Sequence, residues 1–443
     1  MSVAPATKAP PSRDTSLSFG ARHWSIIGIE GLLIWLAAGA QVHGLNVITP
    51  TLSAEYGIDN NTLLAWATPA ALGGVLGGYV VAKTCERKGA RLNILASLLV
   101  CGLAFGLIGV LGGTIPGFFA MFFLVNFFGS GFGYVGGLNL ISNWFPRKKN
   151  LALGFVTMGQ TMSTAMFVPI LAWALGLFGV KGGFWFMAAI MFVMIPIVYF
   201  FVRDYPEQYG RTPDNLPMTP EQIEASRTSV TTARPSFSTR QLLKMKDVWL
   251  IALGSGGVYI MLTGMLSQMV PRQIAMGIEQ GQAITNLSIA AFIGVPGAFI
   301  WGWLGQRFSS RNILLVYTSW WMTAILINTF FALNPVTLWI SLIMIGFSFG
   351  GATSLTTSIV ADKFKRSDFV GAFGVIQPLQ GCLRSCSFAI LAFGIANLGG
   401  YTGAYSLLLG IGVLTFILFF LVKPAPISQD ELETDVAVEA AAV

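Results

Sequence analysis

Residues 82–95 read AKTCERKGARLNIL, and residues 302–315 read GWLGQRFSSRNILL. Each stretch follows a long apolar run, and each carries the pattern Arg-x-x-x-Arg. One offset of 220 positions aligns four residue pairs in the two parts of the chain: Arg87 with Arg307, Arg91 with Arg311, Gly154 with Gly374, and Gln160 with Gln380. The sequence therefore predicts two parallel repeats, related by an axis along the membrane normal.

Composition predicts an all-α integral membrane protein. Of the 443 residues, 54% are hydrophobic and 10% are charged, with a mean hydropathy of +0.70. A soluble domain carries about 25% charged residues, and a helix needs about 20 apolar residues to cross a bilayer. Apolar runs bounded by charges, Pro and Gly predict twelve spans: 24–48, 61–83, 92–112, 115–143, 150–178, 182–202, 247–271, 283–304, 312–332, 335–361, 370–397 and 401–423.

Basic residues predict the orientation of these spans. If both termini face the cytoplasm, the cytoplasmic segments hold 23 of the 26 Lys and Arg residues. The outer segments hold Lys181 and Arg272, and Arg384 remains inside a span. This distribution follows the positive-inside rule and predicts a multi-pass protein of a plasma membrane or a cell inner membrane. The net charge of +7 is then explained by anionic lipid, without a nucleic-acid partner.

A polar, Pro/Ser/Thr-rich stretch separates the sixth and seventh predicted spans and resembles a linker. The sequence predicts five regions: a cytoplasmic N-terminal tail (1–22), a first six-helix bundle (23–202), a cytoplasmic central loop (203–246), a second six-helix bundle (247–423) and a cytoplasmic C-terminal tail (424–443).

The twelve spans, the central loop and the two loop motifs resemble the major facilitator superfamily. Its loop motif is Gly-x-x-x-Asp-Arg-x-Gly-x-Arg, and both copies here depart from it, with Glu86 or Gln306 in place of Asp. The resemblance implies that these loops steady one conformation by pairing charges and helix ends across the halves. Simple topogenic charge is the alternative. The candidate gating residues are Glu86, Arg87, Arg91, Arg307 and Arg311.

A second segment points to a narrower family. Residues 129–155, GSGFGYVGGLNLISNWFPRKKNLALGF, resemble the oxalate/formate antiporter family, which is close to the monocarboxylate porters. The matching features are a Gly/Tyr-rich fourth span, Trp144-Phe145-Pro146 at its end, a basic loop, and Gly154 in the fifth span. The resemblance implies transport of a small organic anion.

Arg384 is the exceptional charge of the sequence, in the run PLQGCLRSCSFAI. A charge at the centre of a span costs roughly 2.5–3.5 kcal/mol on insertion scales and marks a functional site by default. Its planar fork of donors matches a carboxylate. Glu30 is the one acidic residue expected inside a span, so snorkelling or a pair with Glu30 is the structural alternative.

Arg384 belongs to a stripe of polar residues along one face of its predicted helix. Gln377, Gln380 and Arg384 recur on one helical face, and the fifth span carries a matching face. At the offset of 220 the two stripes align as Thr157 with Gln377, Gln160 with Gln380, and Thr164 with Arg384. Two such stripes predict one central substrate cavity, although each alone would also suit interhelical hydrogen bonding.

Five further residues are weaker candidates for the same cavity. Gln41 and His43 fall in the outer half of the first span, and His43 is the obvious titratable group for proton coupling, unless it is a neutral hydrogen-bonding residue. Trp35, Tyr134 and Tyr259 would shape an apolar wall, unless they belong to an interfacial belt.

The charge count predicts the substrate. One central cation favours a monocarboxylate over the dianion oxalate. The resemblance implies that an oxalate carrier has basic residues on both the eighth and the eleventh spans, and the eighth span of this chain has none. The prediction is a secondary transporter that works by exchange or uniport, with Arg384 binding the carboxylate. The alternatives are a transporter of a betaine-like zwitterion or an aromatic acid, and a transporter-like receptor. No enzyme site, cofactor or metal site is predicted, since no convergent catalytic or metal-ligating cluster is visible. The oligomeric state is open.

Overall fold

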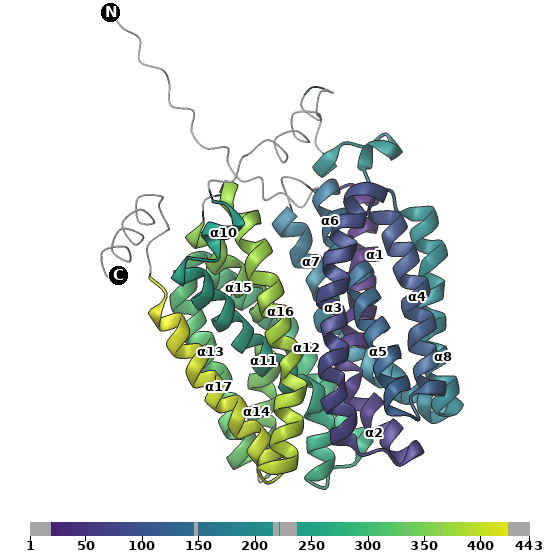
Figure 1. The fold of residues 1–443 in the computed structure, drawn as a ribbon, viewed down its shortest axis with the longest axis vertical. Coiled ribbons are helices and arrows are strands. Elements are labelled where there is room, and N and C mark those ends of the chain that lie inside the picture. Colours follow the sequence, from purple (N-terminus) through teal and green to yellow (C-terminus); the bar gives the residue numbers. More distant parts are fainter. Residues whose placement is uncertain are drawn as a thin grey trace, which may run out of the picture.

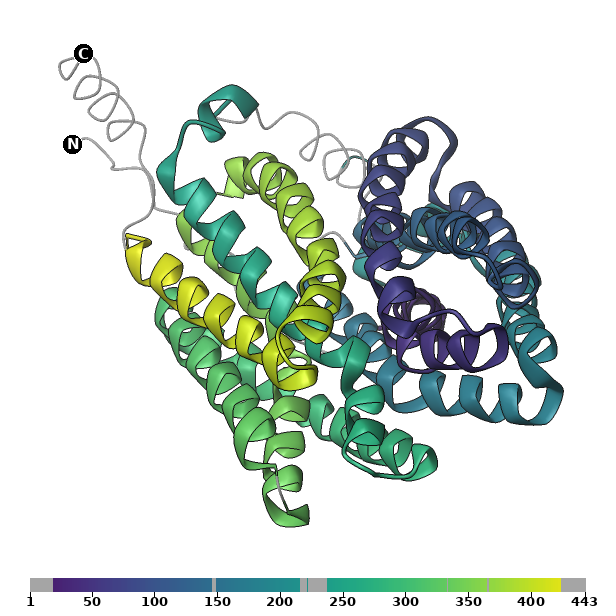
Figure 2. The ribbon, with the colours of Figure 1, turned by 60° about the horizontal axis from the view of Figure 1, so that its bottom comes forward.

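In the computed structural model, residues 19–145, 149–215, 221, 237–332, 334–364 and 366–423 are described. Within them the chain forms helices and no strand. The helices gather into two bundles, purple to blue and green to yellow, which stand side by side (Figures 1 and 2). Residues 1–18 of the predicted N-terminal tail, much of the predicted central loop and the whole predicted C-terminal tail lie outside the described residues.

The first bundle contains eleven consecutive segments, of which η1, η2 and η3 are π-helical. They are α1 (Ala21–Ala38), η1 (Gly39–His43), α2 (Leu45–Tyr56), α3 (Asn60–Lys88), α4 (Ala90–Leu111), α5 (Ile115–Ser130), η2 (Gly131–Val135), α6 (Gly136–Trp144), α7 (Lys149–Met162), η3 (Ser163–Phe167) and α8 (Val168–Phe201).

Short helices follow, and then the second bundle. The connecting helices are η4 (Pro206–Tyr209), η5 (Pro213–Asn215) and α10 (Thr239–Leu242). The second bundle contains α11 (Lys246–Ala275), α12 (Gln280–Arg307), α13 (Ser310–Leu326), the π-helical η6 (Ile327–Phe331), α14 (Pro335–Ser348), α15 (Gly351–Lys363), α16 (Arg366–Asn397) and α17 (Tyr401–Leu421).

Length and hydropathy identify ten described helices that can each cross a bilayer. A bent pair, Pro335–Ser348 with Gly351–Val360, adds an eleventh span with a bend of 42°. The Ala152–Phe201 stretch is 50 residues long, which is twice what a bilayer requires. It breaks at Gly179, where φ is +68° and ψ is 179°, a conformation that glycine adopts without a Cβ penalty. Divided there, it supplies the fifth and sixth predicted spans, which brings the spans of the described residues to twelve.

The helix boundaries repeat the sequence offset. Helices of the two bundles begin 220 positions apart in three cases: α3 and α12, α4 and α13, and α5 and α14. The caps agree, because Thr114 accepts the backbone N–H of Gly117 at the start of α5, and Asn334 accepts that of Thr337 at the start of α14. Side-chain capping of this kind satisfies backbone donors that a helix leaves free. The internal repeat is therefore present in the structure as well as in the sequence.

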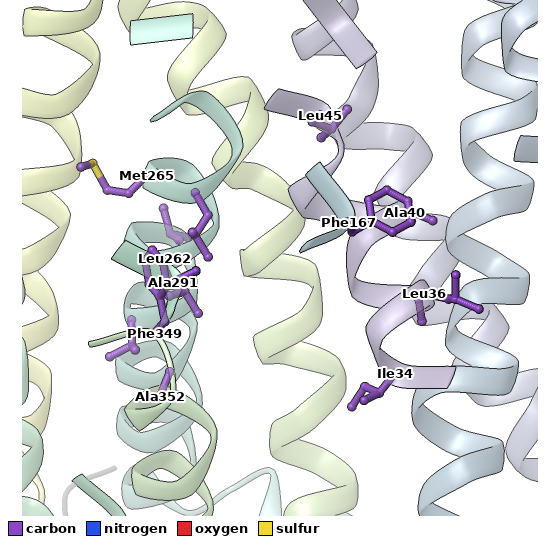
Figure 3. Packing of buried hydrophobic residues seen from close by; sticks show 14 of the residues in the cluster. Ile34, Leu36, Ala40, Leu45, Phe167, Leu262, Met265, Ala291, Phe349 and Ala352 are labelled. Carbon is purple, nitrogen blue, oxygen red and sulfur yellow. The ribbon is translucent and has the colours of Figure 1, made fainter. Parts of the chain in front are cut away.

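Each bundle has its own apolar interior. Figure 3 shows buried residues of both: Leu36, Ala40 and Phe167 in the first bundle, and Leu262 and Met265 in the second. Large apolar residues such as Phe299 and Val336 stay exposed on the outer surface. Lipid accepts these side chains as readily as a protein core does, so an exposed apolar surface is expected of a membrane protein.

Arg91 and Arg311 make matching contacts at the ends of the two bundles. Arg91 Nη2 donates to the backbone oxygen of Tyr199 near the end of α8, and Arg311 Nη2 donates to that of Phe420 near the end of α17, at 2.6 Å. Cationic side chains satisfy the free carbonyl groups at helix C-termini. In this conformation each arginine thus fastens the last helix of its own half.

Candidate functional site

Four candidate residues of the first bundle lie in its π-helical segments: Gln41 and His43 in η1, Tyr134 in η2 and Thr164 in η3. In η1 the backbone N–H of Gly44 reaches back five positions to the Gly39 oxygen, at 2.8 Å. A π-helical turn holds one residue more than an α-helical turn and is common at functional sites. The extra residue turns the following side chains to a new direction, which the 3.6-residue period of the sequence does not show.

Close packing joins η1 to η3. The Phe167 ring lies against Gly39, where an added Cβ would come within 2.2 Å of the ring carbon Cγ. Figure 3 shows Phe167 beside Ala40 of the same segment. This contact brings Thr164 and His43 together, and the Thr164 hydroxyl lies 3.0 Å from His43 Nδ1. Both residues are buried, at 1% and 5% exposure.

Arg384 faces this group from the second bundle. It lies in α16, is half-buried, and is an electrostatic partner of Tyr134. Its charge also reaches His43. The charge of Arg384 thus acts on side chains in two π-helical segments of the opposite bundle.

Tyr259 of α11 extends the site within the second bundle. Its hydroxyl donates to Thr353 Oγ1 at 3.2 Å, and the ring lies within electrostatic range of Tyr134. Thr353 was not among the site residues predicted from the sequence. The repeat offers a signal for it, because the offset of 220 carries the segment Gly131–Val135 onto positions 351–355. The same offset carries η3 onto positions 383–387, which contain Arg384.

The two polar stripes have mixed environments. Gln380 is buried at 7% exposure, Gln160 is half-buried, and Gln377 is exposed. The half-buried Thr157 donates its hydroxyl to the Gly154 oxygen one turn earlier, at 3.0 Å. The stripes thus run from the buried region of Arg384 toward a more exposed end of their helices, and their roles in substrate binding stay predictions.

Gln41 and Trp35 both contact other residues of the first bundle. Gln41 is 1% exposed and donates Nε2 to the Asn126 oxygen at 3.0 Å, which fastens η1 to α5. Trp35 is half-buried and meets the Phe167 ring edge to face, with 5.8 Å between the ring centroids. Both side chains support the π-helical segments that carry the site.

Glu30 does not neutralise Arg384, since no ion pair joins these two described residues. The carboxylate is buried at 1% exposure in α1, and Oε2 has no hydrogen-bond partner among the described residues. It lies against Gly137 of α6. The ion pair resolved in the described part of the chain joins Lys363 to Asp247 inside the second bundle.

The remaining candidates lie away from this region. Arg87 and Arg307 are exposed, and Arg307 lies over the Trp303 ring at 5.4 Å. The Glu86 side chain lies outside what the structure describes. A role of the gating set across the two halves therefore stays a prediction. Among the described residues, no three His, Cys, Asp or Glu side chains gather to hold a metal ion.

Twelve spans in two related bundles, with polar side chains from both meeting between them, define an integral membrane transporter. The sequence model of the Major Facilitator Superfamily matches residues 31–383 and again residues 275–441. The chain belongs to the Major Facilitator Superfamily, and it is a transporter rather than an enzyme.

Three transport proteins are similar to it in sequence. The oxalate:formate antiporter of Oxalobacter formigenes is 23% identical over 244 residues, which is 53% of each chain. The uncharacterized transporter YhjX of Escherichia coli K12 is 22% identical over 78% of this chain and 82% of its own. The 4-hydroxybenzoate transporter PcaK of Pseudomonas aeruginosa is 23% identical over 91% of this chain and 90% of its own.

Solved structures share the fold. A bacterial homolog of the human lysosomal transporter Spinster, inward-facing and unoccupied, matches with a TM-score of 0.71 at 14% identity, over 91% of this chain and 97% of its own. The inward open xylose transporter XylE of E. coli matches with a TM-score of 0.70 at 14% identity, over 93% and 99%. At such identities the likeness shows the fold alone.

Proposed function

We propose that this transporter carries a small monocarboxylate, with the Arg384 guanidinium binding the carboxylate. The observation that supports the proposal is the surroundings of Arg384: the side chains that interact with it across the bundles, Tyr134 and His43, carry no negative charge. A half-buried cation gains stability from an anion, and a guanidinium binds a carboxylate through two parallel hydrogen bonds.

The similar proteins point to the same substrate class. Two of them are named as transporters of oxalate and formate and of 4-hydroxybenzoate, and all three compounds carry a carboxylate. A single central arginine favours a substrate with one negative charge. We therefore favour a monocarboxylate over oxalate, carried in a bacterial cytoplasmic membrane.

An aromatic acid is the second candidate. The Tyr134 ring is an electrostatic partner of Arg384, and Tyr259 is an electrostatic partner of both Tyr134 and Tyr317. Aromatic faces would hold the ring of such a substrate, or the cationic end of a betaine-like zwitterion. Competition by benzoate or by glycine betaine against uptake of a short aliphatic acid distinguishes these candidate substrates.

Transport would follow from a rocking of the two halves, 23–202 and 247–423, about the substrate. Arg384 and Tyr259 belong to one half, whereas Tyr134, His43 and Thr164 belong to the other. A substrate held by both halves links their motion, which is how transporters of this architecture alternate access. Exchange or uniport is the mode proposed here.

The test is uptake of radiolabelled formate, acetate and lactate into proteoliposomes. Arg384→Ala removes the carboxylate partner, so we expect uptake of the transported acid to fall to background. Arg384→Lys keeps the charge but loses the bidentate geometry, so we expect partial uptake with a raised KM. The matched control is Arg240→Ala, which removes an exposed arginine outside the predicted site and gating residues and should transport normally.

Ligand-induced thermal stabilisation separates binding from folding. A ligand at 100 times its Kd stabilises the folded protein by about 2.7 kcal/mol. The substrate should raise the Tm of the wild type and leave that of Arg384→Ala unchanged, with equal Tm values for both proteins without ligand. Undiminished uptake by a folded Arg384→Ala protein would overturn the assignment.

A further inference from the structure

The Thr164 hydroxyl has an unusual partner for a residue within a helical run. A threonine in a helix commonly donates its hydroxyl to a backbone oxygen three or four positions earlier. Thr157, Thr318 and Thr356 of this chain do so. The hydrogen bond described for Thr164 instead joins its hydroxyl to Nδ1 of His43.

This bond determines where the proton of a neutral His43 sits. If Nδ1 carried the proton, Thr164 would accept it, and the hydroxyl hydrogen would be left without an acceptor at a site that is 1% exposed. Leaving a buried donor unsatisfied is costly. If Thr164 donates to Nδ1, both groups are satisfied, and the proton of the imidazole is on Nε2. The Nε2–H tautomer of His43 is therefore the stable one.

The neighbours of η1 favour a neutral imidazole. Arg384 is the ionisable group that acts on His43, and a second positive charge beside it would be repelled. Of the segments that contact η1, α5 and η3 contain no ionisable side chain. The helices α1, α2 and α11 also contact η1, and their ionisable side chains are Arg22, His23, Glu30, Glu55, Tyr56, Lys246, Asp247, Tyr259 and Arg272.

We propose that Thr164 is a positioning residue that holds His43 as the neutral Nε2–H tautomer, so that the site offers an uncharged N–H donor beside Arg384. This inference rests on the proposed function. The Arg384 fork satisfies both oxygens of a carboxylate. The Nε2–H donor is then available for a third, uncharged oxygen, as in a 2-oxo or 2-hydroxy monocarboxylate. This role replaces the proton coupling expected of His43.

The tautomer can be measured directly, because the chain contains two histidines. In protein labelled with ¹⁵N-histidine, the shifts of Nδ1 and Nε2 distinguish the two neutral forms from each other and from imidazolium. His43→Gln removes one set of signals and so assigns the other set to His23. We expect His43 to show the Nε2–H form from pH 5.5 to 8. Imidazolium or the Nδ1–H form would overturn the proposal.

Thr164→Val removes the hydroxyl at nearly constant volume, and Thr164→Ser restores it. We expect Thr164→Val to shift the tautomer signals and to lower the preference for pyruvate and lactate over acetate and propionate about tenfold, as for the loss of one hydrogen bond. Thr164→Ser should recover both. His43→Gln, which keeps an N–H donor at about the Nε2 position, should retain more of the preference than His43→Leu.

The outcomes separate the two proposals. If the tautomer and the preference are the same in wild type and Thr164→Val, the positioning role is wrong and the role of Arg384 stands. A wild type without preference for the substituted acids contradicts the substrate class inferred here. If Arg384→Ala transports every carboxylate normally, the proposed function fails, while the tautomer measurement still decides the role of Thr164. If Thr164→Val does not fold, the wild-type tautomer and Thr164→Ser decide it.

Discussion

Arg384 shows how much a single residue reveals. Its isolation in an apolar run predicted a functional role, and the structure places it opposite Tyr134 and His43 of the other half. The sequence could not choose between Glu30 and a ligand as its counter-charge. The choice depends on which face of α1 is turned inward, and Glu30 faces Gly137 of α6 instead.

Gly137 provides a stability test at the same scale. A Cβ there would lie 1.6 Å from Oε1 of Glu30, so Gly137→Ala forces the buried carboxylate or the helices to move. Overpacking of this kind costs typically 1–3 kcal/mol. We expect a clearly lowered Tm in detergent. Gly410→Ala is the control, because nothing lies within 4 Å of its added Cβ. Equal Tm values for the two variants would contradict the tight contact.

At the scale of elements, a hydrogen-bonded contact joins the two halves near one end of the molecule. Asn46 of α2 donates Nδ2 to the Leu266 oxygen of α11 and accepts the Val270 N–H at 3.0 Å. Leu266 and Val270 are four positions apart, which is the spacing of a direct backbone hydrogen bond in a regular helix. The Asn46 amide bonds to both members of this pair. Pro271, the next residue, has no N–H to donate. In the predicted topology this contact closes the outer side.

Asn46→Ala should open that side. Each lost hydrogen bond contributes about 1 kcal/mol, so the ratio of closed to open molecules should fall by one to two powers of ten. In a variant without the native cysteines, Ser267→Cys next to the contact should react faster with an impermeant maleimide added outside. The control is Asn126→Ala, whose amide donates to Phe122 of its own helix. Unchanged labelling in Asn46→Ala would show that the contact does not hold the halves closed.

At the scale of the whole molecule, the repeat and the basic residues work together. The repeat pairs helices across the two bundles, as the matching starts of α3 and α12 show. The basic residues choose which end of both bundles faces the cytoplasm. Reporter fusions at the C-terminus test that choice: a green fluorescent protein should fluoresce, and an alkaline phosphatase should be inactive. An active phosphatase would reverse the orientation and with it the assignment of the outer side.

The sequence by itself determined the twelve spans, the repeat and the exceptional status of Arg384, because hydropathy and charge act locally and leave a record in each segment. Even the break between the fifth and sixth spans was expected near Gly179, within a run that the structure shows as almost continuous helix. Such features need no knowledge of which helix packs on which.

Only the tertiary structure decided the partners within the site. The π-helical segments η1, η2 and η3 shift the helical phase, so the 3.6-residue period does not predict where His43, Tyr134 and Thr164 point. The sequence predicted Thr164 as a substrate contact, and His43 as either a proton carrier or a neutral hydrogen-bonding residue, but it could not predict that the two side chains lie 3.0 Å apart. That bond depends on the packing of Phe167 against Gly39, a contact between segments far apart in the chain.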